Sequence, residues 1–226
     1  MNVNSITRVA ALIGEAGRIQ MLNVLLDGAG HSASELAMAA TVSPQTASSH
    51  LAKLFSGGLV IFERNGRQRL FRLKNREVAA AIEALGALAP DNSTHAVPEL
   101  RFARTCYDHL AGMLAIALRN ELLKRNVLES RGDAFLLTSA GERFLRTLDV
   151  DAQSLRGLRR SFARTCLDWT EREHHIGGSL GSALLSRFMD LKWLAGTRKS
   201  RAVRLTHEGE RGFERVFGIR RGSLRS

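Results

Sequence analysis

The segment from residue 42 to residue 73 constrains the fold more than any other part of the chain, because it carries the start signal of a helix and a hairpin that follows directly. Ser43 is a favourable N-cap, and Pro44 suits the first helical position, where its missing N–H breaks no hydrogen bond. Three apolar residues recur at helical spacing and predict one buried face: Ala47, Leu51 and Leu54.

A hairpin is predicted immediately after this helix. Gly57-Gly58 supplies the positive φ that ends a helix, and residues 59–62 are aliphatic and aromatic strand formers. Asn65-Gly66 is a strong two-residue hairpin signal, and residues 70–73 complete the returning strand. Four arginines lie around the tip: Arg64, Arg67, Arg69 and Arg72.

The polar side chains of this helix and hairpin predict a DNA-binding surface. Ser, Thr and Gln side chains fit a major groove about 12 Å wide, where Gln can pair bidentately with adenine. Like charges crowded on a hairpin repel one another, so a polyanionic partner is the simplest reason to keep them, although a solvated hairpin is the alternative. The residues expected to contact DNA are Ser43, Gln45, Thr46, Ser48, Ser49, His50, Lys53, Arg64, Arg67, Gln68 and Arg69.

The same segment resembles the ArsR/SmtB family of winged-helix regulators, whose recognition helix has a Ser-x-x-x-x-Ser-x-His-Leu-x-x-Leu character followed by Gly-Leu-Val. The matching positions are Ser43, Ser48, His50, Leu51, Leu54, Gly58, Leu59 and Val60. The resemblance covers about the first 90 residues. It implies a homodimeric repressor whose recognition helices read an inverted-repeat operator in double-stranded DNA, with half-sites about 34 Å apart.

The remaining helices of this domain carry neither of the metal sites known in the family. Amphipathic patterns predict two helices before residue 27, a short helix capped by Ser32 or Ser34, and a last helix over residues 76–88. Many relatives place paired cysteines on the short helix, but residues 35–39 contain none, and the last helix lacks the histidine of zinc-binding relatives. The last helix is expected to pack against a second copy, or only within its own chain.

Composition places this domain in a longer cytoplasmic chain. The 226 residues are 44% hydrophobic and carry a net charge of +11, which is typical of a globular protein with an anionic partner. The chain lacks both an apolar run long enough to cross a membrane and a signal segment, and two cysteines do not form a secreted disulfide framework. A segment rich in turn formers with two prolines, at 89–98, predicts domains at 1–90 and 99–226.

The second domain contains an internal repeat, predicted at residues 99–149 and 159–226. Phe102-Ala103-Arg104-Thr105-Cys106-Tyr107-Asp108 recurs as Phe162-Ala163-Arg164-Thr165-Cys166-Leu167-Asp168, and the segments beginning at His109 and Leu137 recur at His175 and Leu205. Each copy reads as two helices, a short strand and a helix capped by Thr138 or Thr206. The fold class is therefore mainly α with small β-wings: an N-terminal winged helix-turn-helix and a C-terminal pair of winged-helix-like repeats.

Each repeat brings cysteine, aspartate and histidine close together in sequence. If the repeats face one another, two thiolates and two imidazoles suit Zn²⁺ or a similar metal, with aspartate as an orienting group or ligand. The alternatives are cysteines that are simply small buried residues, four positions after Phe102 and Phe162 on a helix, and a thiol-redox or small-molecule pocket lined by Trp169, Trp193, Tyr107 and Phe188. The candidate effector residues are Cys106, Asp108, His109, Cys166, Asp168, His174 and His175.

The basic excess is greatest at the C-terminal end, where residues 150–226 contain 16 basic and 8 acidic residues. We expect Arg156, Arg159, Arg160 and Arg164 to share one helix as a solvated face, a phosphate contact or an anion pocket. The function that fits best is a transcriptional repressor released by an effector, and not an enzyme, because no phosphate loop, nucleophile elbow or metalloprotease motif is present. The alternative is an effector-independent, nucleoid-like DNA-binding protein.

Overall fold

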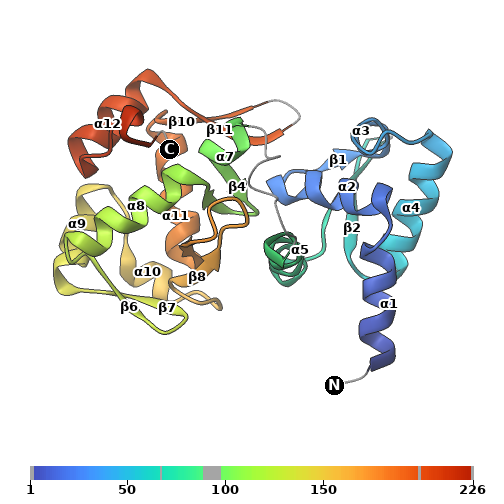
Figure 1. Cartoon of the computed structure of the whole chain (residues 1–226), viewed down its shortest axis with the longest axis horizontal. Coiled ribbons are helices and arrows are strands. Elements are labelled where there is room, and N and C mark those ends of the chain that lie inside the picture. Colours follow the sequence, from blue (N-terminus) through green and yellow to red (C-terminus); the bar gives the residue numbers. More distant parts are fainter. Residues whose placement is uncertain (1–2, 67, 89–97, 198–199, 225–226) are drawn as a thin grey trace. The chain divides into compact units, whose positions relative to one another are not determined.

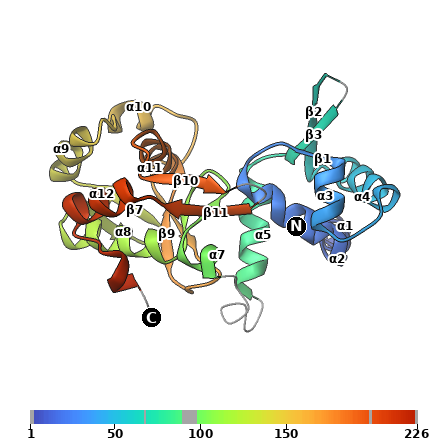
Figure 2. The same cartoon turned by 90° about the horizontal axis from the view of Figure 1, so that it is seen from above.

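The computed structural model describes residues 3–66, 68–88, 98–197 and 200–224, and its chain divides into two compact units (Figures 1 and 2). The N-terminal unit is Met1–Ile82 and the C-terminal unit is Glu83–Ser226, so the division falls inside the last helix of the predicted first domain. Most of the predicted linker, residues 89–97, lies outside the described residues.

The N-terminal unit combines helices with one small sheet. Its elements are α1 (Val3–Ile13), α2 (Ala16–Val24), η1 (Leu25–Asp27), β1 (His31–Ser32), α3 (Ala33–Ala39), α4 (Pro44–Ser56), β2 (Val60–Asn65), β3 (Gln68–Leu73) and α5 (Arg76–Leu88). The predicted extent of α5 is confirmed, and α5 continues from this unit into the next.

The helix-turn-helix forms as its capping residues predict. Ser32 and Glu35 make a reciprocal capping box at the start of α3. Ser43 accepts a hydrogen bond from the backbone N–H of Thr46, and Pro44 occupies the first turn of α4. The three predicted apolar residues of α4 are buried, and they fix this helix to the core of the unit.

A three-stranded antiparallel sheet, in the order β1-β3-β2, forms the wing. The predicted hairpin is confirmed, but its connection is displaced by one residue, because Asn65 is the last paired residue of β2 and lies opposite Gln68. The connection therefore begins at Gly66, whose φ of 60° is the conformation that glycine adopts at the lowest cost. Arg67 lies outside the described residues.

The C-terminal unit repeats one order of elements. The first copy contains α7 (Pro98–Phe102), β4 (Arg104–Cys106), β5 (His109–Ala111), α8 (Met113–Lys124), β6 (Leu128–Arg131), β7 (Ala134–Leu137) and α9 (Ser139–Thr147), and α10 (Ala152–Arg156) follows. The second contains β8 (Arg164–Leu167), β9 (His174–Gly177), α11 (Gly178–Asp190), β10 (Leu194–Thr197), β11 (Ser200–Leu205) and α12 (His207–Phe217), and η2 (Arg221–Leu224) ends it.

The two copies exchange hairpins. One four-stranded sheet has the order β10-β11-β4-β5 and the other has the order β6-β7-β8-β9, so each sheet contains one hairpin from each copy. The helices cross in the same way, since α11 packs against β5 of the first copy and α8 packs against β9 of the second. The two copies therefore face one another and share one hydrophobic core.

Equivalent residues support equivalent turns in the two copies. Gly112 and Gly178 begin α8 and α11 with φ of 89° and 84°, and each lies directly against backbone carbonyls. Thr138 and Thr206 cap α9 and α12 and accept hydrogen bonds from the backbone N–H groups three residues later, as predicted.

Three expectations about this unit are wrong. The Arg-Thr-Cys parts of the repeated segments form strands β4 and β8 and not helices, because each pairs with the strand that follows it, after Tyr107-Asp108 in the first copy and after residues 168–173 in the second. The arginine run does not share a helix, since α10 ends at Arg156 and Arg164 lies in β8. Phe188 and Trp193 stack in the hydrophobic core, 5.8 Å between ring centroids, so they do not line a pocket with Trp169.

Among the described residues, no single helix is long and apolar enough to cross a membrane. One pair, Val3–Ile13 with Ala16–Asp27, reaches the required length and composition together, but it is bent by 83°.

Candidate DNA-binding surface and cysteine–histidine cluster

The exposed side of α4 carries most of the polar residues predicted from the sequence. Gln45, Thr46, Ser49 and Lys53 are exposed along the helix. Ser48 is also exposed, and its hydroxyl donates a hydrogen bond to the backbone carbonyl of Pro44 at 2.9 Å. The Ser43 hydroxyl lies 2.8 Å from that of Thr46, beside its cap interaction. The first two turns of α4 therefore present short hydroxyl and amide groups to solvent.

His50 has a different environment from its neighbours on α4. Its Nε2 lies 3.3 Å from a carboxylate oxygen of Glu15, and the side chain is only 12% exposed. Glu15 caps α2, and hydrogen bonds from the backbone N–H groups of Gly17 and Arg18 lower its pKa. The imidazole thus connects α4 to the start of α2 inside the unit.

The wing carries its charges at defined positions. Arg64 and Arg69 lie directly opposite each other on β2 and β3. The Arg69 guanidinium lies over the ring of Phe62, 4.9 Å from the centroid, while Arg72 pairs with Glu63 at 3.2 Å. Because like charges opposite each other destabilise a hairpin, the Arg64–Arg69 pair favours an anionic partner.

A groove of about 740 Å³ lies between α4 and the wing. Phe55 and Phe62 are among its apolar lining residues, and Ser48, Gln68 and Arg69 are among its polar ones. Recognition-helix and wing residues therefore border the same concave surface.

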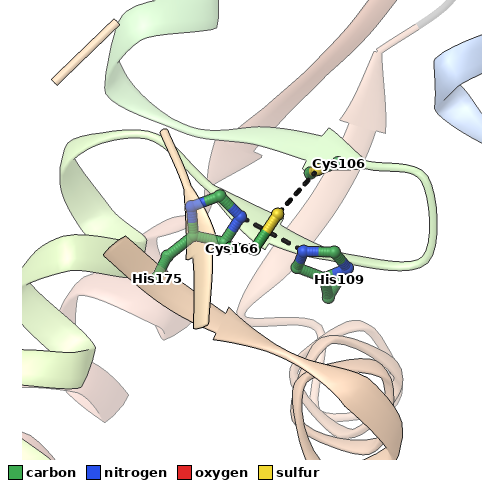
Figure 3. Close-up of side chains that lie close together, drawn as sticks. All are labelled: Cys106, His109, Cys166 and His175. Carbon is green, nitrogen blue, oxygen red and sulfur yellow. Dashed lines mark hydrogen bonds between the residues drawn. The ribbon is translucent and has the colours of Figure 1, made fainter. Parts of the chain in front are cut away.

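A second candidate site is buried in the C-terminal unit. Cys106, His109, Cys166 and His175 are all buried, and one ligand atom from each lies within 4.8 Å of the others (Figure 3). The two thiol sulfurs are 3.8 Å apart and the two imidazole Nε2 atoms are 3.1 Å apart. Both cysteines are free thiols. Cysteine and histidine donors are those that bind borderline-soft metals.

The strand pairing explains why these four side chains meet. Cys106 is opposite His109 across the β4–β5 hairpin, and Cys166 is opposite His175 across the β8–β9 hairpin. Each copy therefore contributes one cysteine and one histidine, and the two hairpins direct them toward a common point (Figure 3).

An aspartate and an arginine stand behind each histidine. Asp108 lies 3.3 Å from Nδ1 of His109 and 2.8 Å from Arg160. Asp168 lies 3.4 Å from Nδ1 of His175 and 2.9 Å from Arg104. His174, also predicted from the sequence, is exposed on β9 and is outside the cluster.

Burial and charge act against each other in this cluster. Burial opposes ionisation of Asp108, but His109 and Arg160 outweigh it and lower its pKa to about 2. A hydrogen bond to Cys166 and burial raise the pKa of Cys106, whereas the bond from Cys106 and the two imidazoles lower the pKa of Cys166. Burial lowers the pKa of His109, but its bonds to Asp108 and Cys166 prevail and raise it.

Sequence reasoning missed Arg104, and it placed Arg160 in a basic run without its pairing with Asp108. Arg104 is completely buried between Asp168, Thr170 and the ring of Trp169. Arg104 lies inside the repeated Phe-Ala-Arg-Thr-Cys motif, among residues that are mostly small or apolar. This context could have indicated that Arg104 is buried. Arg160 has no such signal, because its counterpart in the first copy is not a basic residue.

The N-terminal unit thus has the architecture of a winged helix-turn-helix DNA-binding domain. No family model matches the chain. The HTH-type transcriptional regulator YdfF of Bacillus subtilis is 40% identical over 226 residues, which span 97% of this chain and 100% of that protein.

Two solved structures are similar to part of the chain. One is the homodimeric winged helix-turn-helix domain of Mb0332 from Mycobacterium bovis, described as a possible ArsR-family regulator. It is 27% identical to this chain, the match covers 42% of this chain and 87% of that domain, and the TM-score is 0.37. The other is reduced HlyU from Vibrio cholerae, which is 30% identical. The match covers 39% of this chain and 92% of HlyU, and the TM-score is 0.36.

The full-length similarity to YdfF and the recognition-helix motif agree. This chain belongs to the HTH-type transcriptional regulators, and the recognition-helix motif of its N-terminal winged helix resembles that of the ArsR family.

Proposed function

We propose that the protein is a homodimeric, sequence-specific repressor that binds an inverted-repeat operator and is released by an effector acting on its C-terminal unit. Two features of one unit support this proposal: the recognition helix α4 has an exposed polar side, and Arg64 and Arg69 lie opposite each other on the wing. Because such a protein acts on the chromosome, its place is the cytoplasm.

Base recognition is assigned to the first turns of α4. In helix-turn-helix proteins the N-terminal residues of the recognition helix contact base edges. Gln45 and Ser49 are exposed there, and Gln45 can make two hydrogen bonds to an adenine. Thr46 is also exposed, but its hydroxyl would have to leave that of Ser43 to reach a base. Ser43 and Ser48 have their hydroxyls engaged within the helix, so their contribution is to hold its first turn or to contact phosphates.

Backbone contacts are assigned to the wing and to the groove beside it. With α4 in the major groove, a phosphate strand would lie over the concave surface between α4 and the wing. Gln68 and Arg69 border this surface and offer donors to phosphate oxygens. These contacts supply affinity and salt dependence but little sequence preference.

Dimerisation is assigned to the apolar face of α1. Val3 and Ile6 are 72% and 47% exposed, and Val9 is also exposed, although three such residues on one helix would ordinarily be buried. A second copy of the chain would cover this face and give the two recognition helices that an inverted repeat requires. Ile6→Glu should shift the protein from dimer to monomer in sedimentation experiments, whereas Thr7→Ala on the same helix should not.

Release by an effector requires a change in the spacing of the recognition helices. An effector that prefers one conformation lowers DNA affinity by its differential affinity, typically about 1–3 kcal/mol. Helix α5 is suited to this role because its last residues belong to the C-terminal unit, where buried Glu83 forms an ion pair with Arg201. An effector bound to that unit would therefore act on α5.

The test is selection of binding sites from genomic DNA by the full chain, followed by gel-shift measurements. We expect an inverted repeat bound about 10³-fold or more tightly than random DNA at physiological salt. Gln45→Ala should relax the preference at one position of each half-site, while Ser56→Ala, at the far end of α4, should leave it unchanged. Equal affinity for operator and random DNA would instead support the nucleoid-like alternative.

A further inference from the structure

We propose that the C-terminal unit binds one zinc-class divalent cation between its two repeats, with Cys106, His109, Cys166 and His175 as the four ligands. The proposal concerns a site within this unit and does not depend on DNA recognition. It follows from the distances, orientation, burial and charge of these four side chains.

The distances are those of a tetrahedral site. The edge of a tetrahedron is about 1.6 times the distance from its centre to a corner, so Zn–S bonds of about 2.3 Å and Zn–N bonds of about 2.0–2.1 Å require separations of about 3.8 Å between sulfurs and about 3.3 Å between nitrogens. The observed separations are 3.8 Å and 3.1 Å. The remaining pairs of ligand atoms lie within 4.8 Å of one another, so one cation fits among the four after shifts of about 1 Å or less.

The orientation of the imidazoles also fits a cation. A ring nitrogen that faces a carboxylate carries the proton, so Nδ1 of His109, next to Asp108, leaves its Nε2 as a lone pair. Nδ1 of His175 faces Asp168 at 3.4 Å but makes no hydrogen bond with any described residue. The two Nε2 atoms share a hydrogen bond at 3.1 Å. A cation that binds both nitrogens takes the place of this proton, and the proton of His175 then lies on Nδ1, which faces Asp168.

The charges balance in the buried site. When the divalent cation binds, the two thiols release their protons, and two thiolates with two neutral imidazoles give a complex of zero net charge. The two aspartates already have Arg160 and Arg104 as partners. A neutral complex avoids the large cost of a buried net charge.

The donor set selects the class of metal. Thiolate and imidazole ligands favour zinc-class cations over magnesium and calcium, which prefer oxygen. Four protein ligands fill a tetrahedral shell and leave no open position for a substrate, as in structural zinc sites. Since each repeat contributes one cysteine and one histidine, the cation would cross-link the repeats.

The test is metal analysis of the full-length protein, purified with a reductant and without a metal-affinity step. We expect about one zinc per chain and, after exchange into Co²⁺, the visible bands of a tetrahedral site with a thiolate charge-transfer band. Cys106→Ser and His175→Gln should each lose the zinc and these bands. His174→Gln is the matched control, because His174 is exposed beside His175. This variant should retain the zinc and the Co²⁺ bands.

Loss of folding is distinguished from loss of ligands by two further measurements. Circular dichroism of each variant reports whether the unit is folded, and oxidation of the wild-type thiols to a disulfide should release the zinc without any substitution. Trace metal in the reduced wild type together with no Co²⁺ bands, or zinc retained by folded Cys106→Ser, would overturn the proposal. Failure of operator binding would not affect these readouts.

Discussion

Arg104 donates a hydrogen bond to Asp168 at 2.9 Å, and neither side chain is exposed to solvent. The two residues come from different repeats, β4 and the connection that follows β8. Asp168 also accepts hydrogen bonds from the backbone N–H of Gly112 at 2.7 Å and from Thr170. This carboxylate therefore joins the repeats at the start of α8, directly behind His175.

Removal of one partner of this pair should strongly destabilise the protein. Arg104→Met leaves the Asp168 charge buried without its cation, and the free energy of unfolding should fall by about 3–5 kcal/mol. Arg220→Ala breaks an exposed ion pair with Glu214 and should cost less than about 1 kcal/mol. Urea denaturation followed by tryptophan fluorescence measures both, because both tryptophans lie in this unit. Equal effects of the two substitutions would contradict a structural role for the pair.

Gly178 should not tolerate a side chain. Its φ is 84°, and a Cβ would lie 2.7 Å from the carbonyl oxygens of Ser161 and Phe162. Gly178→Ala should therefore reduce the free energy of unfolding by more than about 2 kcal/mol, since strain and a steric clash add. Gly132 also has a positive φ but has open space around it, so Gly132→Ala reports the strain alone, about 1–2 kcal/mol. A similar cost in both variants would show that the carbonyl contacts are unimportant.

The N-terminal unit was predictable because local signals determine its elements. The Ser43-Pro44 start and the Gly57-Gly58 end of α4, and the start of α5, where Asn75 accepts a hydrogen bond from the backbone N–H of Val78, are set by capping and turn chemistry within a few residues. The position of the wing turn could not be predicted in this way, because Asn65-Gly66 can occupy either of two adjacent registers. Strand pairing along the whole hairpin selects one of them.

The C-terminal unit was predictable only in part. The repeat followed from the sequence, but the meeting of its cysteines and histidines was expected only if the two copies face one another, which the sequence did not decide. The helical assignment of the segment around Cys106 was wrong. A spacing of four residues does not require one helix, because Phe102 ends α7 and Cys106 lies on the strand β4 that follows it. Cys106 and His109 are three apart and Cys166 and His175 nine apart, so only the hairpins reveal the two pairs as equivalent.

Arg69→Ala should weaken DNA binding at all sequences alike. We assign Arg69, on the wing, to a phosphate contact, so its loss should remove about one such contact and lower the slope of log K against log salt by about 1. Titrations of operator and random DNA at several salt concentrations measure the slope. Arg211→Ala, which removes a charge from an exposed ion pair in α12, is the control for net charge. A change of sequence preference in Arg69→Ala would assign it to base readout instead.

His31 should make the N-terminal unit more stable at mildly acid than at alkaline pH. Its Nε2 lies 2.7 Å from Asp27, and this hydrogen bond raises the pKa of His31 above its ordinary value near 6.5. Because the folded state holds the proton more tightly, the stabilisation is complete below about pH 6.5 and is lost as pH rises through the folded-state pKa. The pair is partly buried, so the expected contribution is about 1 kcal/mol or less.

Hydrogen exchange of the backbone around residues 25–40, corrected for intrinsic rates, measures this contribution in the full chain. The difference in protection between wild type and His31→Gln should be present at pH 6 and absent at pH 9. Asp27→Asn should behave like His31→Gln, because either substitution removes the charged partner. Glu77→Gln, an exposed carboxyl on α5, should retain the wild-type pH dependence in this segment. If His31→Gln retained it as well, the dependence would have to come from another group.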